Sequence, residues 1–291
     1  MFEYLKLFYF LLRPKTIFVR RISGALGDNI LLTVLLPGLK RKYPDHKIVV
    51  ETPIPELFLN NPHVDWITGK HFKTTGKFIK PKYRVAGKTG APFISQIQGY
   101  IGSGDYALPE LHLAAEEIDR ARAEFDFPFV AIAPSGKTKF SANRNIWGIG
   151  NFQSARDHYP DIKFVQIGLT SEPLLERVID ARGRSLRETA AILKNSIFFL
   201  GHQGGFMHLN KAVGKTSVLI FGGYIRPDIA GYGDDMNLYS EVDCSPCYTS
   251  EEKQTDCPSM KCMKMIAVDT VIAAVDDMLG KSANMGSEHE D

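Results

Sequence analysis

Residues 186–222 read LRETAAILKNSIFFLGHQGGFMHLNKAVGKTSVLIFG. Apolar residues recur at helical spacing over 186–194 and 207–213, whereas 196–200 and 217–221 are short apolar runs typical of buried strands. Both runs end at glycine, the first at Gly201 and the second at Gly222. Short buried strands that alternate with helices predict a parallel sheet in an α/β layer fold.

The same alternation occurs on both sides of this segment. We expect further strands at 16–22, 47–51, 127–133 and 163–167, and further helices at 30–43, 152–159, 172–181 and 268–279. Residues 70–104 show weak periodicity and are expected to be rich in loops, and the tail at 281–291 is expected to be disordered. The pattern predicts two doubly wound, Rossmann-like α/β domains facing a cleft, at 16–125 and 126–280.

Composition excludes several classes of protein. The chain has 291 residues, with 35 Lys and Arg against 33 Asp and Glu, and 44% of its residues are hydrophobic. A net charge of +2 argues against a nucleic-acid coat protein, and the apolar fraction argues against a disordered chain. The basic segment 70–88 is interpreted as a solvated loop or as a surface that binds phosphorylated sugars, so no nucleic acid partner is expected.

The N-terminal segment 1–15 is rich in leucine and aromatic residues. Its longest apolar run, 7–12, is far shorter than the roughly 20 residues that cross a bilayer, and it fits a secretory signal poorly. One interpretation is a helix in the membrane interface, and the other is a terminal helix packed on the domain. The residues that would enter the lipid are Phe8, Tyr9, Leu11 and Leu12.

Two strand ends in the second domain are candidate phosphate sites. Gly204 and Gly205 lie between a strand and a helix whose free N–H groups suit an anion, and His208 follows one turn later. After another strand come Ser135, Gly136 and Lys137, with Arg144 nearby. Two such sites suggest a diphosphate, although tight turns and a core histidine would give the same pattern. No GxxxxGK[ST] phosphate loop is present.

In the first domain, Gly27, Asp28 and Asn29 lie on a strand-to-helix turn that faces the expected cleft. Asp28 either caps the helix expected to begin near Ile30 or accepts a proton at the junction of the domains. The residues alone leave both interpretations open.

All four cysteines fall between residues 244 and 262, with the spacing Cys244-x2-Cys247-x9-Cys257-x4-Cys262. Four soft ligands within a short loop suit a structural zinc ion or a mononuclear iron ion. The alternatives are two disulfides or four reduced thiols.

Several stretches together resemble glycosyltransferase family 9, the bacterial heptosyltransferase family with the GT-B fold. They are IFVRRISGALGDNILLTVLLPGLKRKYP at 17–44, VAIAPSG at 130–136, IKFVQIG at 162–168 and the segment 186–222 quoted above. The resemblance covers most of residues 16–279, with 70–125 shorter and more divergent. It implies an acceptor-side domain at 16–125 and a nucleotide-sugar donor domain at 126–280 that includes a Cys-rich loop at 244–262.

The resemblance also assigns roles to individual residues. It implies that Asp28 is the catalytic base and that its neighbours Gly27 and Asn29 lie on the acceptor side. It places on the donor side Ser135, Gly136, Lys137, Arg144, Glu172, Gln203, Gly204, Gly205 and His208. The sequence departs from the family where Gln203 replaces the usual acidic residue and where Asn145 replaces a lysine, for which Arg144 is the expected substitute.

The implied function is inverting transfer of a sugar from a nucleotide-sugar donor, ADP-heptose or another, to a cell-envelope saccharide or lipid-linked acceptor such as lipopolysaccharide. The alternative is a nucleotide or nucleotide-sugar binding module without transfer activity. No catalytic metal is expected, because amides, His208 and basic side chains can stabilise a departing diphosphate. The implied location is the cytoplasm, with peripheral contact to the inner face of the bacterial inner membrane.

Overall fold

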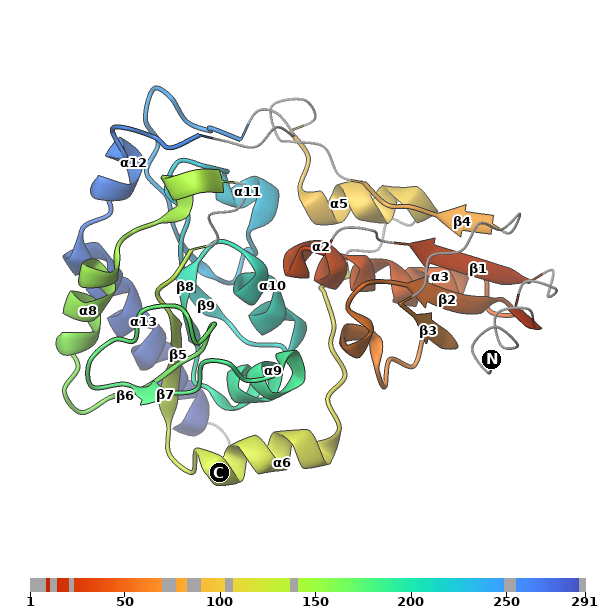
Figure 1. The fold of residues 1–291 in the computed structure, drawn as a ribbon, viewed down its shortest axis with the longest axis horizontal. Coiled ribbons are helices and arrows are strands. Elements are labelled where there is room, and N and C mark those ends of the chain that lie inside the picture. The colour runs from red at the N-terminus through yellow and green to blue at the C-terminus, as the bar shows by residue number, and fades with distance from the viewer. Residues whose placement is uncertain are drawn as a thin grey trace.

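The computed structural model describes residues 9–10, 15–20, 24–69, 77–82, 90–102, 107–136, 141–248 and 255–287. They form two parallel β-sheets flanked by helices, shown side by side in Figure 1. The strands are β1 Thr16–Arg20, β2 Lys47–Glu51, β3 Trp66–Thr68, β4 Lys77–Ile79, β5 Phe129–Ala133, β6 Lys163–Gln166, β7 Ile179–Asp180, β8 Phe199–His202, β9 Ser217–Ile220 and β10 Met236–Leu238.

The α-helices range from the four residues of α11 and α12 to the 20 residues of α13. The α-helices are α2 Leu26–Ile30, α3 Leu36–Lys42, α5 Phe93–Gln98, α6 Ala115–Glu124, α8 Ile149–Asp157, α9 Leu186–Asn195, α10 Gly205–Ala212, α11 Pro227–Ala230, α12 Lys261–Lys264 and α13 Val268–Ser287. The 3-10 helices are η1 Leu31–Leu35, η2 Pro55–Phe58, η3 Gly99–Ile101 and η4 Ala142–Asn145.

Both sheets have Rossmann topology, which confirms the predicted fold class. The second sheet has the order β10-β9-β8-β5-β6-β7 with every pair parallel, which is the doubly wound order of six strands. The first sheet has the order β3-β2-β1-β4, which matches the first four strands of the same Rossmann arrangement. In each sheet the winding reverses beside the first strand, between β1 and β4 and between β5 and β8.

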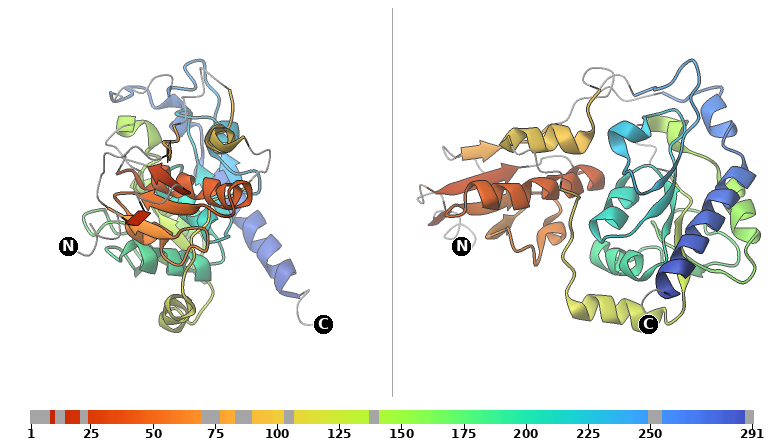
Figure 2. Two further views of the ribbon diagram at one scale, coloured as in Figure 1. Left: turned by 90° about the vertical axis from the view of Figure 1, so that its right-hand side faces the viewer. Right: turned by 180° about the vertical axis from the view of Figure 1, so that it is seen from behind.

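Strand periodicity divides the second sheet between two hydrophobic cores. In β5, Phe129, Ala131 and Ala133 face a core that includes α9 and α10, whereas Val130 and Ile132 face a core that includes α8 and α13. Successive side chains of a strand point to opposite faces, so five buried residues in a row serve both layers. Figure 2 shows α13 on the side of this sheet that lies away from the first sheet.

Helix α6 packs against the second sheet's helices although it precedes the expected domain boundary. The Arg187 guanidinium of α9 donates to the Glu117 carboxylate, with a distance of 2.6 Å from Nε to Oε1. The Asn195 amide donates to the carbonyl of Ile118 at 3.0 Å. The chain therefore reaches the second unit before residue 124.

Two expectations about local structure were wrong, one at residues 172–181 and one in the C-terminal tail. The helix expected at 172–181 is instead a series of turns leading into β7, because the buried Gln166 amide binds the backbone there. Its Nε2 donates to the Pro173 carbonyl at 2.7 Å, and its Oε1 accepts from the Leu175 amide at 2.9 Å. The segment 70–104, expected to be rich in loops, contains the short elements β4 and α5 among its described residues, and the expectation is not contradicted.

The C-terminal tail is helical up to Ser287, eight residues beyond the helix end expected at 279. Two i to i+4 interactions support the extension. The Lys281 ammonium pairs with the Asp277 carboxylate at 2.6 Å, and the Ser282 hydroxyl donates to the Met278 carbonyl at 2.9 Å. Residues 288–291 lie outside the described part of the chain.

Most of the apolar N-terminal segment also lies outside the described residues, so neither interpretation of it is settled. Of the part described, Phe10 is buried and stacks on Trp66 with 5.4 Å between ring centroids, whereas Tyr9 is half exposed. Within the described ranges, no helix combines the length and the apolar character that a bilayer crossing requires.

Candidate functional site

The two sheets meet where α2 and α10 lie side by side (Figure 1). Glycines on both helices make this contact close. A Cβ atom on Gly27 would lie 2.8 Å from Cδ2 of His208, and one on Gly205 would lie 3.2 Å from the Cβ of Leu26. Any larger residue at Gly27 would displace His208. The sequence therefore places glycine where α2 of the first unit touches His208 of the second unit.

Asp28 lies in the first turn of α2. The helix begins at Leu26, four residues before its expected start, and its N-cap residue is Ala25. The interpretation of Asp28 as a helix cap was therefore wrong. The negative charge of Asp28 raises the pKa of His208, so the two side chains interact across the junction of the sheets.

Asn29, expected on the acceptor side, is fully buried. Its Nδ2 donates to the Ala25 carbonyl at 2.9 Å, and its Oδ1 accepts from the Thr52 hydroxyl at 2.7 Å. Thr52 directly follows β2, so Asn29 ties α2 to the neighbouring strand end. Its observed role is to support the turn that carries Asp28.

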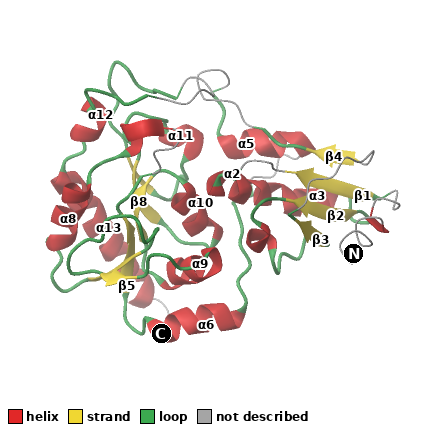
Figure 3. Cartoon of the chain, in the orientation of Figure 1, coloured by secondary structure: helices red, strands yellow, loops and turns green. Residues whose placement is uncertain are grey.

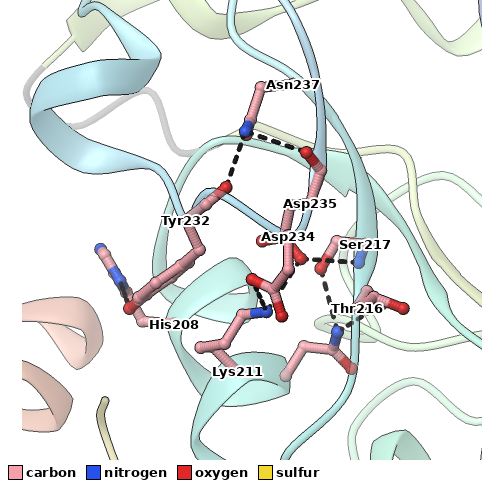
Figure 4. Close-up of polar contacts among 9 residues, drawn as sticks. His208, Lys211, Thr216, Ser217, Tyr232, Asp234, Asp235 and Asn237 are labelled. Atoms are coloured by element: carbon pink, nitrogen blue, oxygen red, sulfur yellow. Dashed lines mark hydrogen bonds and ion pairs between the residues drawn. The ribbon is translucent and has the colours of Figure 1, made fainter. Parts of the chain in front are cut away.

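His208 is buried at the start of α10, and Figure 4 shows its ring directed at Tyr232. The distance from Nδ1 of His208 to the Tyr232 hydroxyl is 2.6 Å. Burial lowers the pKa of His208 to about 4, and the charge of Asp28 opposes this shift. The imidazole is therefore neutral at pH 7. The N-cap position of α10 is Gly204, with φ of 156°, and it contributes no side-chain cap to the N–H groups of the first turn.

The expected donor-side turns lie at the switch point of the second sheet. Ser135 and Gly136 follow β5, and Gln203 and Gly204 follow β8, the strand next to it. A Cβ atom on Gly136 would lie 2.5 Å from the carbonyl oxygen of Asn145, so this position requires glycine. Ligands of doubly wound sheets bind at this reversal in strand order.

Glu172 lies one strand further along the same edge, after β6. Its Oε2 accepts from the Leu169 amide at 3.2 Å and folds over Gly168, whose φ is 140°. Burial raises the pKa of this carboxyl group. The residue is at the expected edge of the sheet, with its carboxylate turned toward the backbone of its own turn.

Arg144 does not take the place of the missing family lysine. Its Nε donates to the Thr255 carbonyl at 3.0 Å, and its side chain lines a small cavity with the four cysteines. The Arg144 guanidinium hydrogen-bonds the Cys247 thiol and opposes the rise in its pKa that burial causes. The donor-side assignment of Arg144 was based on proximity in sequence, which did not give the direction of the side chain. Lys137 lies outside the described residues.

The four cysteines surround one cavity of about 10 Å³, and all are free thiols. Across the described ranges, no three potential metal ligands among Cys, His, Asp and Glu are close enough to coordinate an ion. Asn143 links this loop to η4, since its Oδ1 accepts from the Cys257 amide at 2.7 Å and its Nδ2 donates to the Cys257 carbonyl at 3.0 Å. Cys244, Cys247 and Cys257 lie between β10 and α12, and Cys262 lies in α12, whose place Figure 3 shows.

Three residues that shape the candidate site had no role assigned to them from sequence, although Asn145 had been noted as a departure from the family. The Asn145 amide donates to Oε1 of Gln203 at 3.3 Å. Nε2 of His202 accepts from the Trp147 amide at 2.9 Å, and burial lowers the pKa of His202 to about 3. His202 and Asn145 are next in sequence to the assigned residues Gln203 and Arg144, so their position could have indicated them. Tyr232 lies 24 positions beyond His208, and no local signal joined the two.

An open cavity of about 540 Å³ lies beside β4, in the middle of the basic segment 70–88. Its walls include the aromatic rings of Tyr43, Phe78 and Tyr100 and the side chain of Lys80. Residues 70–76 and 83–88 of the segment lie outside the described ranges, so its expected role in binding phosphorylated sugars stays a prediction.

No protein-family model matches the sequence, and no curated protein sequence matches it significantly. Solved structures do match. The glycosyltransferase family 9 structure from Veillonella parvula is 17% identical with a TM-score of 0.70, covering 93% of this chain and 98% of its own. ADP-heptose lipopolysaccharide heptosyltransferase II of E. coli is 13% identical with a TM-score of 0.71, covering 92% of this chain and 99% of its own.

A third similar structure is TibC of enterotoxigenic E. coli, described as a dodecameric iron-containing heptosyltransferase in complex with ADP-D-β-D-heptose. It is 14% identical with a TM-score of 0.73, and the match covers 93% of this chain and 77% of TibC. The chain therefore has the GT-B fold of glycosyltransferase family 9 structures, as the resemblance implied.

Proposed function

We propose that this chain is an inverting glycosyltransferase that moves a sugar from a nucleotide-sugar donor to a cell-envelope saccharide. The observation that carries the proposal is the approach of Gly27 to His208, because it brings Asp28 of one sheet to the candidate donor turn of the other. The fold shared with heptosyltransferase structures supports the same activity.

In the proposed reaction, Asp28 accepts the proton of the acceptor hydroxyl as its oxygen attacks the anomeric carbon. Attack from the face opposite the diphosphate inverts the configuration at that carbon. Backbone N–H groups at the start of α10 and the neutral His208 ring would donate hydrogen bonds to the oxygens that gain charge. These donors can stabilise the leaving group without a catalytic metal.

ADP-heptose is one candidate donor, since TibC is described in complex with it. In this chain the donor turn carries the neutral Gln203, whose Oε1 accepts a hydrogen bond from Asn145. The side-chain amides of Gln203 and Asn145 would recognise sugar hydroxyls by hydrogen bonds without a charge. The proposal therefore includes donors that carry a sugar other than heptose. We propose a saccharide of the lipopolysaccharide type as acceptor, reached from the cytoplasmic face of the inner membrane.

The test begins with a thermal-shift screen of nucleotide sugars, because a ligand that binds the folded state raises the melting temperature. Donors that bind are then used in transfer assays with saccharide acceptors. Asp28→Asn should reduce the transfer rate by at least about 100-fold, since general-base catalysis contributes about 10²–10⁴-fold. The matched control is Asp269→Asn, which changes an exposed carboxylate in the first turn of α13.

A nucleotide-sugar binding module without transfer activity is the second candidate, favoured by the uncharged Gln203. It predicts binding of a nucleotide sugar with no transfer and no hydrolysis in the wild type. Full transfer by Asp28→Asn would instead contradict the assignment of the base and leave the donor site standing.

We also propose that Cys244, Cys247, Cys257 and Cys262 hold a structural zinc or iron ion. They line a single small cavity, and the Arg144 guanidinium beside Cys247 favours the thiolate form that a metal requires. Their separation in the described structure means that the loop would have to contract around the ion. TibC, described as iron-containing, shares the fold.

Elemental analysis of the purified chain tests the metal proposal. A native site should give close to one metal ion per chain, and less than about 0.2 per chain would contradict it. Cys262→Ser should lower both the metal content and the melting temperature. The transfer chemistry proposed above uses none of these thiols.

A further inference from the structure

His208 is held at two edges of its ring by different parts of the chain. Nδ1 lies 2.6 Å from the Tyr232 hydroxyl, within the second unit. The opposite edge lies against the first unit, where Cδ2 and Nε2 are 2.8 Å and 3.5 Å from a Cβ position on Gly27. One nitrogen therefore faces a phenol, and the other faces the turn that carries Asp28.

These two environments favour one tautomer. A neutral imidazole has one N–H donor and one acceptor nitrogen, and a phenol can fill either role. Gly27, the chain neighbour of Asp28, lies on the Nε2 side; the negative charge of Asp28 acts on the ring, and a carboxylate can only accept hydrogen bonds. A proton on Nε2 suits that side. Nδ1 then accepts from the Tyr232 hydroxyl.

Tyr232 is itself fixed from several directions. It is buried, its backbone carbonyl accepts from Nδ2 of Asn237 at 2.9 Å, and Nζ of Lys211 lies 5.3 Å from its ring centroid (Figure 4). The Lys211 side chain is only 2% exposed and pairs with Asp234 at 2.7 Å and with Asp235 at 3.1 Å. A buried cation with two carboxylate partners cannot easily turn away, so the Tyr232 ring has a rigid support.

Lys211 and His208 are three residues apart on α10, so they project from the same face of that helix. Asp235 connects this support to the sheet, because its Oδ1 also accepts from the Ser217 amide at the start of β9 at 2.9 Å. Strand β9, helix α10 and Tyr232 thus form one connected polar network that ends at Nδ1 of His208.

We infer that Tyr232 is a positioning residue that holds His208 in the Nε2–H tautomer, so that a neutral N–H donor faces an oxygen of the bound sugar or diphosphate. The inference rests on the proposed function for the identity of that oxygen. Because His208 stays neutral at pH 7, its contribution is a hydrogen bond, and it does not deliver a proton as an acid. Tyr232 acts only through His208 and touches no reacting atom.

The first test needs no substrate. Nitrogen NMR of the histidine rings in the ligand-free protein reports which nitrogen carries the proton, and His208→Asn identifies the His208 signals. The expected result at pH 7 is protonation at Nε2 in the wild type and a mixture of tautomers in Tyr232→Phe. Protonation at Nδ1 in the wild type would overturn the inference whatever the chain catalyses.

The second test is a double-mutant cycle on transfer kinetics with the best donor from the screen. Tyr232→Phe should lower kcat about tenfold, the loss expected for one hydrogen bond, with the donor KM changed less than about threefold. Tyr232→Phe combined with His208→Asn should be no slower than His208→Asn alone, because the hydroxyl acts through the ring. Independent, multiplying losses would show a merely structural role and refute the inference.

Tyr159→Phe is the matched control. It removes the hydroxyl of a residue just after α8 that donates to the Asp276 carboxylate of α13 at 2.8 Å. It should leave both kcat and the His208 signals unchanged. If no nucleotide sugar supports transfer while the NMR result is as expected, the proposed function fails and the positioning of His208 by Tyr232 stands.

Discussion

Gly27→Ala tests the junction of the two sheets with a single added methyl group. The new Cβ would lie 2.8 Å from Cδ2 of His208, whereas carbon atoms that are not bonded approach to about 3.5–4.0 Å. His208, or the whole of α2, must therefore move by about 1 Å. A displacement of this size at a reacting centre can cost about 100-fold in rate.

The effect on stability should be smaller than the effect on the rate. Crowding a packed contact costs about 1–3 kcal/mol, but alanine is favoured over glycine inside a helix by about 1 kcal/mol. The net destabilisation is then about 0–2 kcal/mol, a fall of at most about 8 °C in melting temperature for domains of this size.

The assay measures kcat/KM for transfer and the melting temperature of each variant. Gly27→Ala should lose 10- to 100-fold in kcat/KM, given a cost of about 1.4 kcal/mol per factor of ten. Gly24→Ala is the control on the same turn, since a Cβ there meets nothing within 4 Å. Transfer by Gly27→Ala at the wild-type rate, with the His208 ring signals unmoved, would show that α2 and α10 do not meet as described.

Other variants test the donor side, the buried histidine and the cysteine loop. Gly136→Ala should weaken binding of a nucleoside diphosphate at least about tenfold by calorimetry, because its Cβ would lie 2.5 Å from the Asn145 carbonyl oxygen; Gly150→Ala, which meets nothing within 4 Å, should bind normally. His202 has a pKa of about 3 when folded against 6.5 unfolded, so the unfolded chain binds the extra proton and stability is lost as the pH falls from 6.5 towards 3. The free energy of unfolding, measured by urea at several pH values, should therefore change less steeply with pH in His202→Asn, by about 1.4 kcal/mol per pH unit in this window. An unchanged dependence on pH would contradict burial of a neutral ring. Asn143→Ala should lower the free energy of unfolding by about 1–3 kcal/mol and speed hydrogen exchange at residues 255–262, because it removes both hydrogen bonds to Cys257. Unchanged exchange there would mean that η4 does not hold the loop.

Much of the site could be located from sequence because its residues follow strands directly. Gly27, Gly136 and Gly204 each lie in a turn that begins soon after an apolar run, and such turns collect at one edge of a parallel sheet. The structure confirms that β5, β6 and β8 are neighbours, so the turns with Gly136, Glu172 and Gln203 share that edge.

Errors arose where a side chain had a choice of partners. Arg144 was assigned to the donor from its position in the chain, but it turns to the cysteine loop more than 100 residues away in sequence. The helix expected at 172–181 fails because buried Gln166 captures the backbone of that segment. Helical periodicity describes which residues are apolar, and it carries no information about a polar side chain on a neighbouring strand.

The sequence by itself determined the fold class and the turns that carry Asp28, Gly136 and Gly204. Strand and helix periods, and the need for glycine at close backbone approaches, are local properties that a chain displays residue by residue. Only the tertiary structure decided that Gly27 touches His208, that Tyr232 holds the same ring and that Lys211 supports Tyr232. These contacts join residues distant in the chain, and they exist because strand order and helix packing bring two sheets and a later loop to one point.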